Sequence, residues 1–158
     1  MIGEVPEVAL TAAVSGRKVE LRQIGMPAVL IFHTRETATD AGVVNQSIRR
    51  KYSRASIVMV ANVVNLRGVP WLFRGIAESA LRKAYQEVAA ALPQGMSPED
   101  YVVILPDWDS AVTEAVGLQD VDNAVGILVL DRAGNVVGVY QEDDPVSAAL
   151  AMLIKAGA

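Results

Sequence analysis

The stretch from His33 to Asp40 carries side chains that could bind or transform a ligand. It supplies an imidazole, a guanidinium, several hydroxyls and a carboxylate, from His33, Thr34, Arg35, Thr37, Thr39 and Asp40. It follows an apolar run typical of a buried strand, and ligands of open α/β sheets bind at this end of a strand. Such groups at the start of a helix would suit an anion or a carboxylate. The alternative is that Thr37, Thr39 and Asp40 cap the helix while Arg35 and Glu36 are solvated.

His33 is the only histidine in the chain. It could act as a general base, but no serine or cysteine nucleophile sits beside it. A second histidine at the spacing of a zinc site is absent, and Asp40 is the nearest carboxylate partner in the sequence. We therefore expect no metal site and no cofactor. His33 is expected to be partly buried, with a local hydrogen bond.

Asp107, Trp108 and Asp109 form a second candidate site after a predicted strand. The two carboxylates could hold a divalent cation under the indole ring, or Asp109 could cap the next helix while Trp108 covers the loop. The capping role accounts for both residue types and is the one we favour. Trp71 and Phe73 could form an exposed aromatic patch for a partner, or Phe73 could belong to the buried row of its helix.

Composition limits the possible functions. The chain has 158 residues and no cysteine, which excludes disulfides, thiolate metal ligands and a cysteine nucleophile. The net charge is −4, and the only dense basic stretch, 49–54, falls at a predicted helix end where cations suit the helix dipole. We therefore expect neither a nucleic-acid nor a membrane partner.

Chain length and hydropathy indicate the organisation and location. No apolar run approaches the ~18 residues that span a bilayer, and the first residues lack the basic and long apolar regions of a secretory signal. We expect a single cytoplasmic domain over residues 1–158. The hydrophobic content of 52% makes a homodimer a plausible assembly.

Apolar runs and turn residues predict the order of the elements. Strands are expected at 8–10, 18–21, 28–32, 57–63, 101–105, 125–130 and 136–140. Helices are expected around Val44 and Ile48, at 71–92, at 110–116, and from Pro145 onward behind the capping residues Asp143 and Asp144. The long helix 71–92 has two adjacent apolar rows, so it is expected to pack across the sheet.

This order predicts a three-layer α/β/α sandwich preceded by an N-terminal β-hairpin. The runs 28–32 and 57–63 are separated by one helix, which predicts neighbouring parallel strands. The closing hairpin requires at least one antiparallel pair, so the central sheet is expected to be mixed.

Two groups of residues resemble a known family. Near the N-terminus the residues are Gly3, Pro6, Leu10, Gly16, Val19 and Leu21, followed by Pro27, Val29, Leu30 and Phe32. Near the C-terminus Val116-Gly117-Leu118 precedes Val129-Leu130-Asp131-Arg132-Ala133-Gly134-Asn135-Val136-Val137. In order and spacing they resemble the opening and the ending of the redoxin group, the thioredoxin-like and peroxiredoxin-like domains of the AhpC-TSA superfamily. The resemblance spans nearly the whole chain and implies a thioredoxin-like fold.

The resemblance also implies where a redox site would lie. In the reductase members the nucleophilic cysteine falls at the position of Thr37, and the second cysteine at the position of Asp40. The cis-proline that faces the cysteines falls at Val125, where a trans peptide bond is expected because a cis bond costs ~3 kcal/mol without proline. A threonine hydroxyl cannot replace a thiolate. The chain thus resembles a divergent, cysteine-free member, and no thiol oxidoreductase activity is expected of it.

We therefore expect a non-redox domain that binds a small ligand or a protein at the vacated site. This site is expected to place Thr37, at or just before the N-terminus of its helix, close to Val125. Two alternatives stay open. One is a non-thiol enzyme that uses His33, Arg35 and the loop of Asp107 and Asp109. The other is an accessory subunit that docks a partner carrying the thiol.

Overall fold

The computed structural model describes residues 5–158. Its strands are β1 (Ala9–Thr11), β2 (Lys18–Glu20), β3 (Ala28–His33), β4 (Met59–Asn65), β5 (Ile104–Asp107), β6 (Gly126–Leu130) and β7 (Val136–Tyr140). Its α-helices are α1 (Ala38–Lys51), α2 (Arg74–Ala91), α3 (Pro98–Tyr101), α4 (Ala111–Ala115) and α5 (Pro145–Lys155). Two short 3-10 turns, η1 (Leu21–Gln23) and η2 (Trp71–Phe73), complete the order. No helix within residues 5–158 has the length and apolar character needed to cross a membrane.

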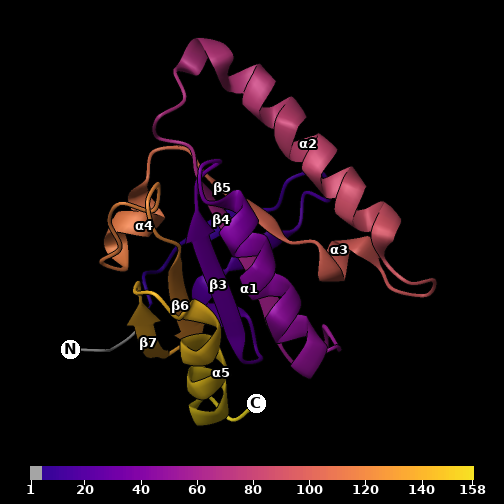
Figure 1. Ribbon diagram of the computed structural model, residues 1–158, viewed down its shortest axis with the longest axis vertical. Coiled ribbons are helices and arrows are strands. Elements are labelled where there is room, and N and C mark those ends of the chain that lie inside the picture. Colours follow the sequence, from indigo (N-terminus) through magenta and orange to yellow (C-terminus); the bar gives the residue numbers. More distant parts are fainter. Residues whose placement is uncertain (1–4) are drawn as a thin grey trace.

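The main sheet is mixed and has the strand order β5-β4-β3-β6-β7 (Figure 1). β3 and β4 are parallel neighbours, with Ala28 opposite Met59 and Phe32 opposite Val63, so the predicted crossover is confirmed. β6 runs antiparallel to both β3 and β7. A separate antiparallel hairpin of β1 and β2 precedes this sheet, as the sequence predicted.

β3 is the central strand of the five, and all six of its residues are buried. Side chains of a strand alternate between the two faces of a sheet. Val29 and Ile31 pack with α1 and α5 on one face, whereas Leu30 and Phe32 pack with the hairpin and the segment around α4 on the other. Continuous β-branched and aliphatic runs are typical of strands covered on both faces.

The turn between β6 and β7 has the local chemistry that its sequence predicts. The Asp131 carboxylate accepts hydrogen bonds from the backbone N–H groups of Ala133 at 3.0 Å and Asn135 at 2.9 Å. Gly134 has a φ of +88°, and a Cβ there would lie 2.7 Å from the Arg22 carbonyl oxygen. Glycine is therefore required twice over, by backbone conformation and by space. After β7, the Asp144 side chain caps α5 by accepting from the Ser147 N–H.

The third buried strand of the main sheet lies further along the chain than predicted. The sequence indicated a strand at 101–105, but Pro98–Tyr101 forms the short helix α3 and the strand is Ile104–Asp107. The prolyl ring of Pro98 sets the φ of a first helical turn, and Glu99 and Asp100 follow it where carboxylates suit the helix dipole. These local preferences outweigh the apolar run at the start of the predicted strand.

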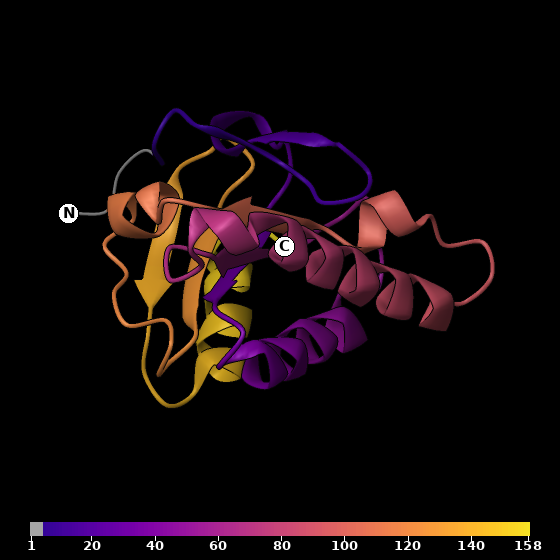
Figure 2. The same ribbon diagram turned by 90° about the horizontal axis from the view of Figure 1, so that it is seen from above.

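The long helix α2 differs most from expectation. It was predicted to pack across the sheet with both apolar rows, but only Tyr85 among its residues is buried. Leu81 and Ala89 also pack with the residues of β5, whereas Ile76 and Val88 are exposed. In η2, Trp71 is 80% exposed and Phe73 is exposed as well, so placing Phe73 in a buried row was wrong. Figures 1 and 2 show α2 standing apart from α1, beside the sheet edge formed by β5.

Candidate functional site

Thr37 occupies the position before the first residue of α1, as predicted. Its hydroxyl donates a hydrogen bond to the carbonyl oxygen of Val121 at 2.6 Å and accepts one from the Thr34 N–H at 3.1 Å. The residue is only 4% exposed. At the position where the sequence resemblance places the nucleophilic cysteine, a buried hydroxyl therefore links the start of α1 to the loop before β6.

Val125, the second predicted element of the vacated site, lies at the end of that loop. It is buried in the same hydrophobic cluster as Ala41 and Val44 of α1. No peptide bond within residues 5–158 is cis, so the predicted trans bond before Val125 is confirmed. The loop 121–125 is thus bonded to the start of α1 through the Thr37 hydroxyl, and its last residue, Val125, shares a hydrophobic cluster with α1.

Apart from Thr37, the buried His33 and the partly buried Thr34, the stretch 33–40 is open to solvent. Thr39 and Asp40 are exposed, and the α1 N-terminus has no side-chain cap, so the predicted capping by Thr37, Thr39 and Asp40 is wrong. The oxygen of the buried Thr37 hydroxyl accepts from the Thr34 N–H, which precedes α1, instead of from an N–H in the first turn of the helix. The exposed guanidinium of Arg35 pairs with the Glu36 carboxylate at 3.8 Å.

His33 belongs to a chain of neutral hydrogen bonds. Its Nδ1 lies 2.8 Å from the Thr34 carbonyl oxygen, and its Nε2 lies 3.2 Å from the Asn62 side-chain nitrogen. Asn62 in turn accepts from the amide of Asn45 at 2.9 Å. A carbonyl can only accept and an amide nitrogen only donates, so the proton of the neutral ring sits on Nδ1 and Nε2 accepts. The predicted local hydrogen bond of His33 is present.

The electrostatics of His33 follow from this position. Burial disfavours the charged imidazolium and lowers the pKa of His33 below 6.5, against a smaller opposing effect of the Thr34 carbonyl. Among residues 5–158 no carboxylate pairs with the ring: its partners are a backbone carbonyl and an amide. His33 is thus a neutral link in the wall of the site rather than half of a charged pair.

We expect the stability of the protein to fall as the pH drops below 6.5, the pKa of an unperturbed histidine. The folded state holds His33 neutral at a pH where the unfolded chain already binds the proton, so the free energy of unfolding should decline by at most about 1.4 kcal/mol per pH unit. The decline should stop below the folded-state pKa. Denaturant unfolding between about pH 7.5 and pH 5.5 measures it, since unpaired carboxylates titrate lower.

A His33→Asn variant is the control, because it should lack this component of the slope. The single imidazole also allows a direct reading by nitrogen-15 NMR. A folded-state pKa at or above 6.5, or a proton on Nε2, would contradict the described network.

The second candidate site is separated from the first. Asp107 is buried and its carboxylate accepts from the Val112 N–H at 3.3 Å, the Thr113 N–H at 2.9 Å and the Thr113 hydroxyl at 2.8 Å. Both sites flank β4: His33 of β3 pairs with Val64, and Asp107 of β5 pairs with the next residue, Asn65. Successive residues of a strand face opposite sides of the sheet, so Asp107 and His33 lie on opposite faces.

Asp109 and Trp108 complete that loop without joining the first site. Asp109 is exposed and accepts from the Ala111 N–H, while Asp107 supplies the deeper cap of α4. The predicted cap therefore exists, but its principal residue is Asp107. Trp108 lies against the guanidinium of Arg74, 4.1 Å from the ring centroid, and so fastens the start of α2 to this loop.

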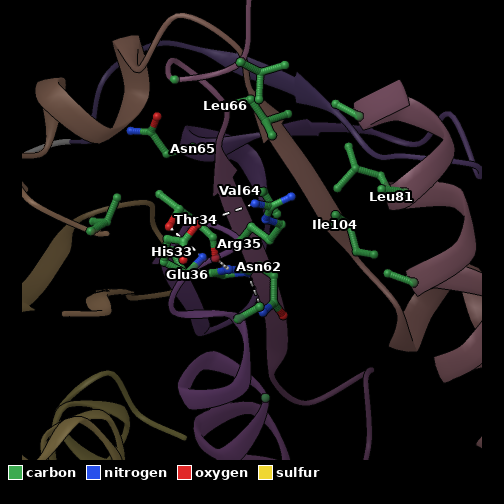
Figure 3. A pocket seen from close by; sticks show the side chains of 18 of the residues that line it. His33, Thr34, Arg35, Glu36, Asn62, Val64, Asn65, Leu66, Leu81 and Ile104 are labelled. Atoms are coloured by element: carbon green, nitrogen blue, oxygen red, sulfur yellow. Dashed lines mark hydrogen bonds and ion pairs between the residues drawn. The ribbon is translucent and has the colours of Figure 1, made fainter. Parts of the chain in front are cut away.

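The structure contains a cleft that the sequence did not reveal. A space of about 1140 Å³ lies between α1, α2 and the strands β4 and β5, and it begins at the predicted site residues His33, Thr34 and Arg35. Asn62 and Val64 line the floor, and Leu81 of α2 and Ile104 of β5 lie across from the polar residues (Figure 3). Asn62 and Asn65, the two polar residues of β4, were the local signals of this cleft.

One residue of the basic stretch 49–54 points inward, although the sequence predicted a solvated helix end there. Arg49, in the last turn of α1, is half-buried; it donates to the carbonyl oxygens of Tyr52 and Val58 and stacks over the ring of Tyr101. The expectation that this stretch is a solvated helix end therefore does not hold for Arg49.

Within residues 5–158, no group of three or more His, Cys, Asp or Glu side chains is placed to hold a metal ion.

Comparison with solved structures places this geometry in a known fold. An exposed lipoprotein thioredoxin of Streptococcus pneumoniae superimposes with a TM-score of 0.62 and 17% identity, covering 95% of this chain and 99% of that one. A secreted disulfide oxidoreductase of Mycobacterium tuberculosis gives 0.57 and 12%, covering 94% and 96%. A thiol-disulfide oxidoreductase of Bacteroides fragilis gives 0.59 and 10%, covering 95% and 98%. No protein-family model and no curated protein sequence matches the chain.

These similarities establish the fold, which agrees with the architecture predicted from the sequence. Two of the three proteins are described as exposed or secreted, so the cytoplasmic location remains a prediction. The structural neighbours are thiol-disulfide proteins, whereas this chain has no cysteine at any position. The protein therefore has a thioredoxin-like fold that contains no cysteine.

Proposed function

We propose that this protein is a non-redox binding domain whose site is the cleft between α1, α2 and the β4–β5 floor. One observation carries the proposal: the redox position is closed by Thr37, while an open cleft of about 1140 Å³ begins beside it at His33 and Arg35. Small-molecule sites are concave and largely apolar, with a few fixed polar groups, and this cleft has that composition.

The polar groups around the cleft favour binding over catalysis. His33 is held between a carbonyl and an amide, and Asp107 faces the other side of the sheet. A general base needs an oriented nucleophile or a substrate proton within reach, and no such pair converges on His33 among the described residues. These contacts count against the enzyme alternative.

A docked thiol protein is also less well supported than a ligand. A partner's thiol would need to meet this chain where the cysteine pair of a reductase lies. Thr37 at that position is buried, and its hydroxyl both donates and accepts a hydrogen bond. The accessible space is instead the neighbouring cleft, whose wall on α2 is apolar.

The proposal predicts that apolar dyes bind in the cleft and that a side chain filling it excludes them. Phenylnaphthylamine and its sulfonate analogue, anilinonaphthalene sulfonate, fluoresce when they enter apolar sites. Ala80 is exposed and lines the cleft from α2, so Ala80→Trp should weaken the binding of either dye at least tenfold. Fluorescence titration measures the dissociation constants.

Ala90→Trp is the matched control, because Ala90 is exposed on the same helix but does not line the cleft. It should bind the dyes as the wild type does. If neither dye binds the wild type, or if both tryptophan variants bind alike, the cleft is not a binding site and the proposal fails.

A further inference from the structure

The polar end of the cleft has unused hydrogen-bonding capacity. Asn62 uses one N–H toward His33, and its oxygen accepts from Asn45, which uses one N–H. Each side-chain amide has two N–H donors and an oxygen with two lone pairs. The second N–H of each amide and the oxygen of Asn45 are therefore left for other partners, and both residues line the cleft. This end can both donate to and accept from one ligand group.

The charged side chains that line the cleft are two arginines held in ion pairs and three carboxylates. The Arg35 guanidinium pairs with Glu36 at 3.8 Å, and the Arg67 guanidinium pairs with Glu114 at 2.6 Å. Asp120 and Asp122 add two further carboxylates at the opening. An anionic head would meet arginines already neutralised, beside uncompensated carboxylates, and would lose its hydration on entry. A cationic head would face the same desolvation at the neutral amide end.

The opposite wall is apolar along its length. Ile76, Ala80, Ala84 and Val88 recur on α2 at helical spacing, and they line the cleft instead of packing against the sheet. The floor adds Val64, which lies beside Asn62 on β4, and Ile104 of the neighbouring strand β5 (Figure 3). Covering such a surface with a ligand removes apolar area from water, which stabilises the complex.

We propose that the cleft takes an uncharged amphipathic small molecule. Its head, a carboxamide or another group that both donates and accepts, bonds to Asn45 and Asn62, and its apolar body lies along α2 over β4 and β5. This inference rests on the proposed function, because it names the class of ligand for the same site.

The test compares three probes with one tail and different heads: octanamide, octanoate and octylammonium. Each is titrated into nitrogen-15 labelled protein, and chemical-shift changes of the side-chain amides of Asn45 and Asn62 are followed. Octanamide should bind about tenfold or more tightly than either ion, the effect of losing roughly one well-made hydrogen bond to a desolvated head.

Two variants distinguish the contribution of the probe's head group to binding from that of its apolar tail. Asn45→Leu should weaken octanamide about tenfold and bring it to the level of the ions. Ala80→Trp should weaken all three probes, and Ala90→Trp none. A folded Asn45→Leu protein, verified by circular dichroism, that keeps the wild-type preference for octanamide would refute the assigned head position.

The outcomes distinguish this inference from the proposed function. If octanoate or octylammonium binds as tightly as octanamide while Ala80→Trp still abolishes dye binding, the ligand class is wrong and the binding function stands. If no probe shifts Asn45 or Asn62 although the dyes bind, the class is also wrong. If Ala80→Trp leaves all binding unchanged, the site itself is misplaced and both proposals fail.

Discussion

Replacing Asp107 by alanine should lower the free energy of unfolding by about 3 kcal/mol, because three buried donors lose a charged acceptor at once. The carboxylate accepts from the N–H groups of Val112 and Thr113 and from the Thr113 hydroxyl. Both Asp107 and Thr113 are 2% exposed, so water cannot take the place of the lost acceptor. Chemical denaturation followed by circular dichroism measures the loss.

Asp109→Ala is the matched control for that measurement. Asp109 lies two residues away on the same loop, but it is exposed and makes one hydrogen bond, to the Ala111 N–H. Its replacement should change the free energy of unfolding by no more than about 1 kcal/mol. Equal losses in the two variants would mean that the α4 cap is not held by Asp107. The contrast also bears on function, since a carboxylate engaged by three donors has little capacity left for a cation.

Much of the fold follows from local sequence features. The run Ala28–Phe32 is apolar at every position, so it could only be a strand covered on both faces. The turn at Asp131 and Gly134 needs an acceptor and a positive φ, and the residue types identify both. These features act within a few residues of each other, which is why the sequence alone indicates them.

The site depends on contacts that no local pattern carries. The periodicity of α2 identifies its apolar rows, but not whether the sheet covers one row or two. The Thr37 hydroxyl could cap its own helix or bond elsewhere, and its partner Val121 lies 84 positions further along the chain. The cleft results from such long-range choices. Leu81 and Tyr85 of α2 join the hydrophobic cluster that contains Ile104 of β5, whereas Ile76, Ala80, Ala84 and Val88 line the gap beside α1.

His33 shows the same division between local and long-range information. Its hydrogen bond to the adjacent Thr34 carbonyl was expected from the sequence, and it is present. Its second partner, Asn62, comes from the neighbouring strand, and Asn45 extends the chain from α1. The sequence therefore identified His33 at the polar end of the cleft, but not the two amides, Asn45 and Asn62, that accompany it there.

A cysteine introduced at Thr37 should react slowly, although the sequence resemblance places the nucleophile of a reductase at this position. The site is 4% exposed, and its side chain is directed at the Val121 carbonyl oxygen, which would repel a thiolate. The start of α1 would favour the thiolate, but a helix terminus acts only on an anion that can form there. Since the native chain has no cysteine, the variant carries a single thiol.

Thr39→Cys provides the comparison, because Thr39 is exposed in the first turn of the same helix. Alkylation of Thr37→Cys by iodoacetamide should be on the order of 100-fold slower than that of Thr39→Cys, because the buried thiol must await local opening. The two rates should converge in denaturant. Fast alkylation of Thr37→Cys at mildly acidic pH would instead show an accessible, acidified thiol. In that case the hydroxyl of Thr37 does not close the old redox position, and ligand binding would have to be sought there as well as in the cleft.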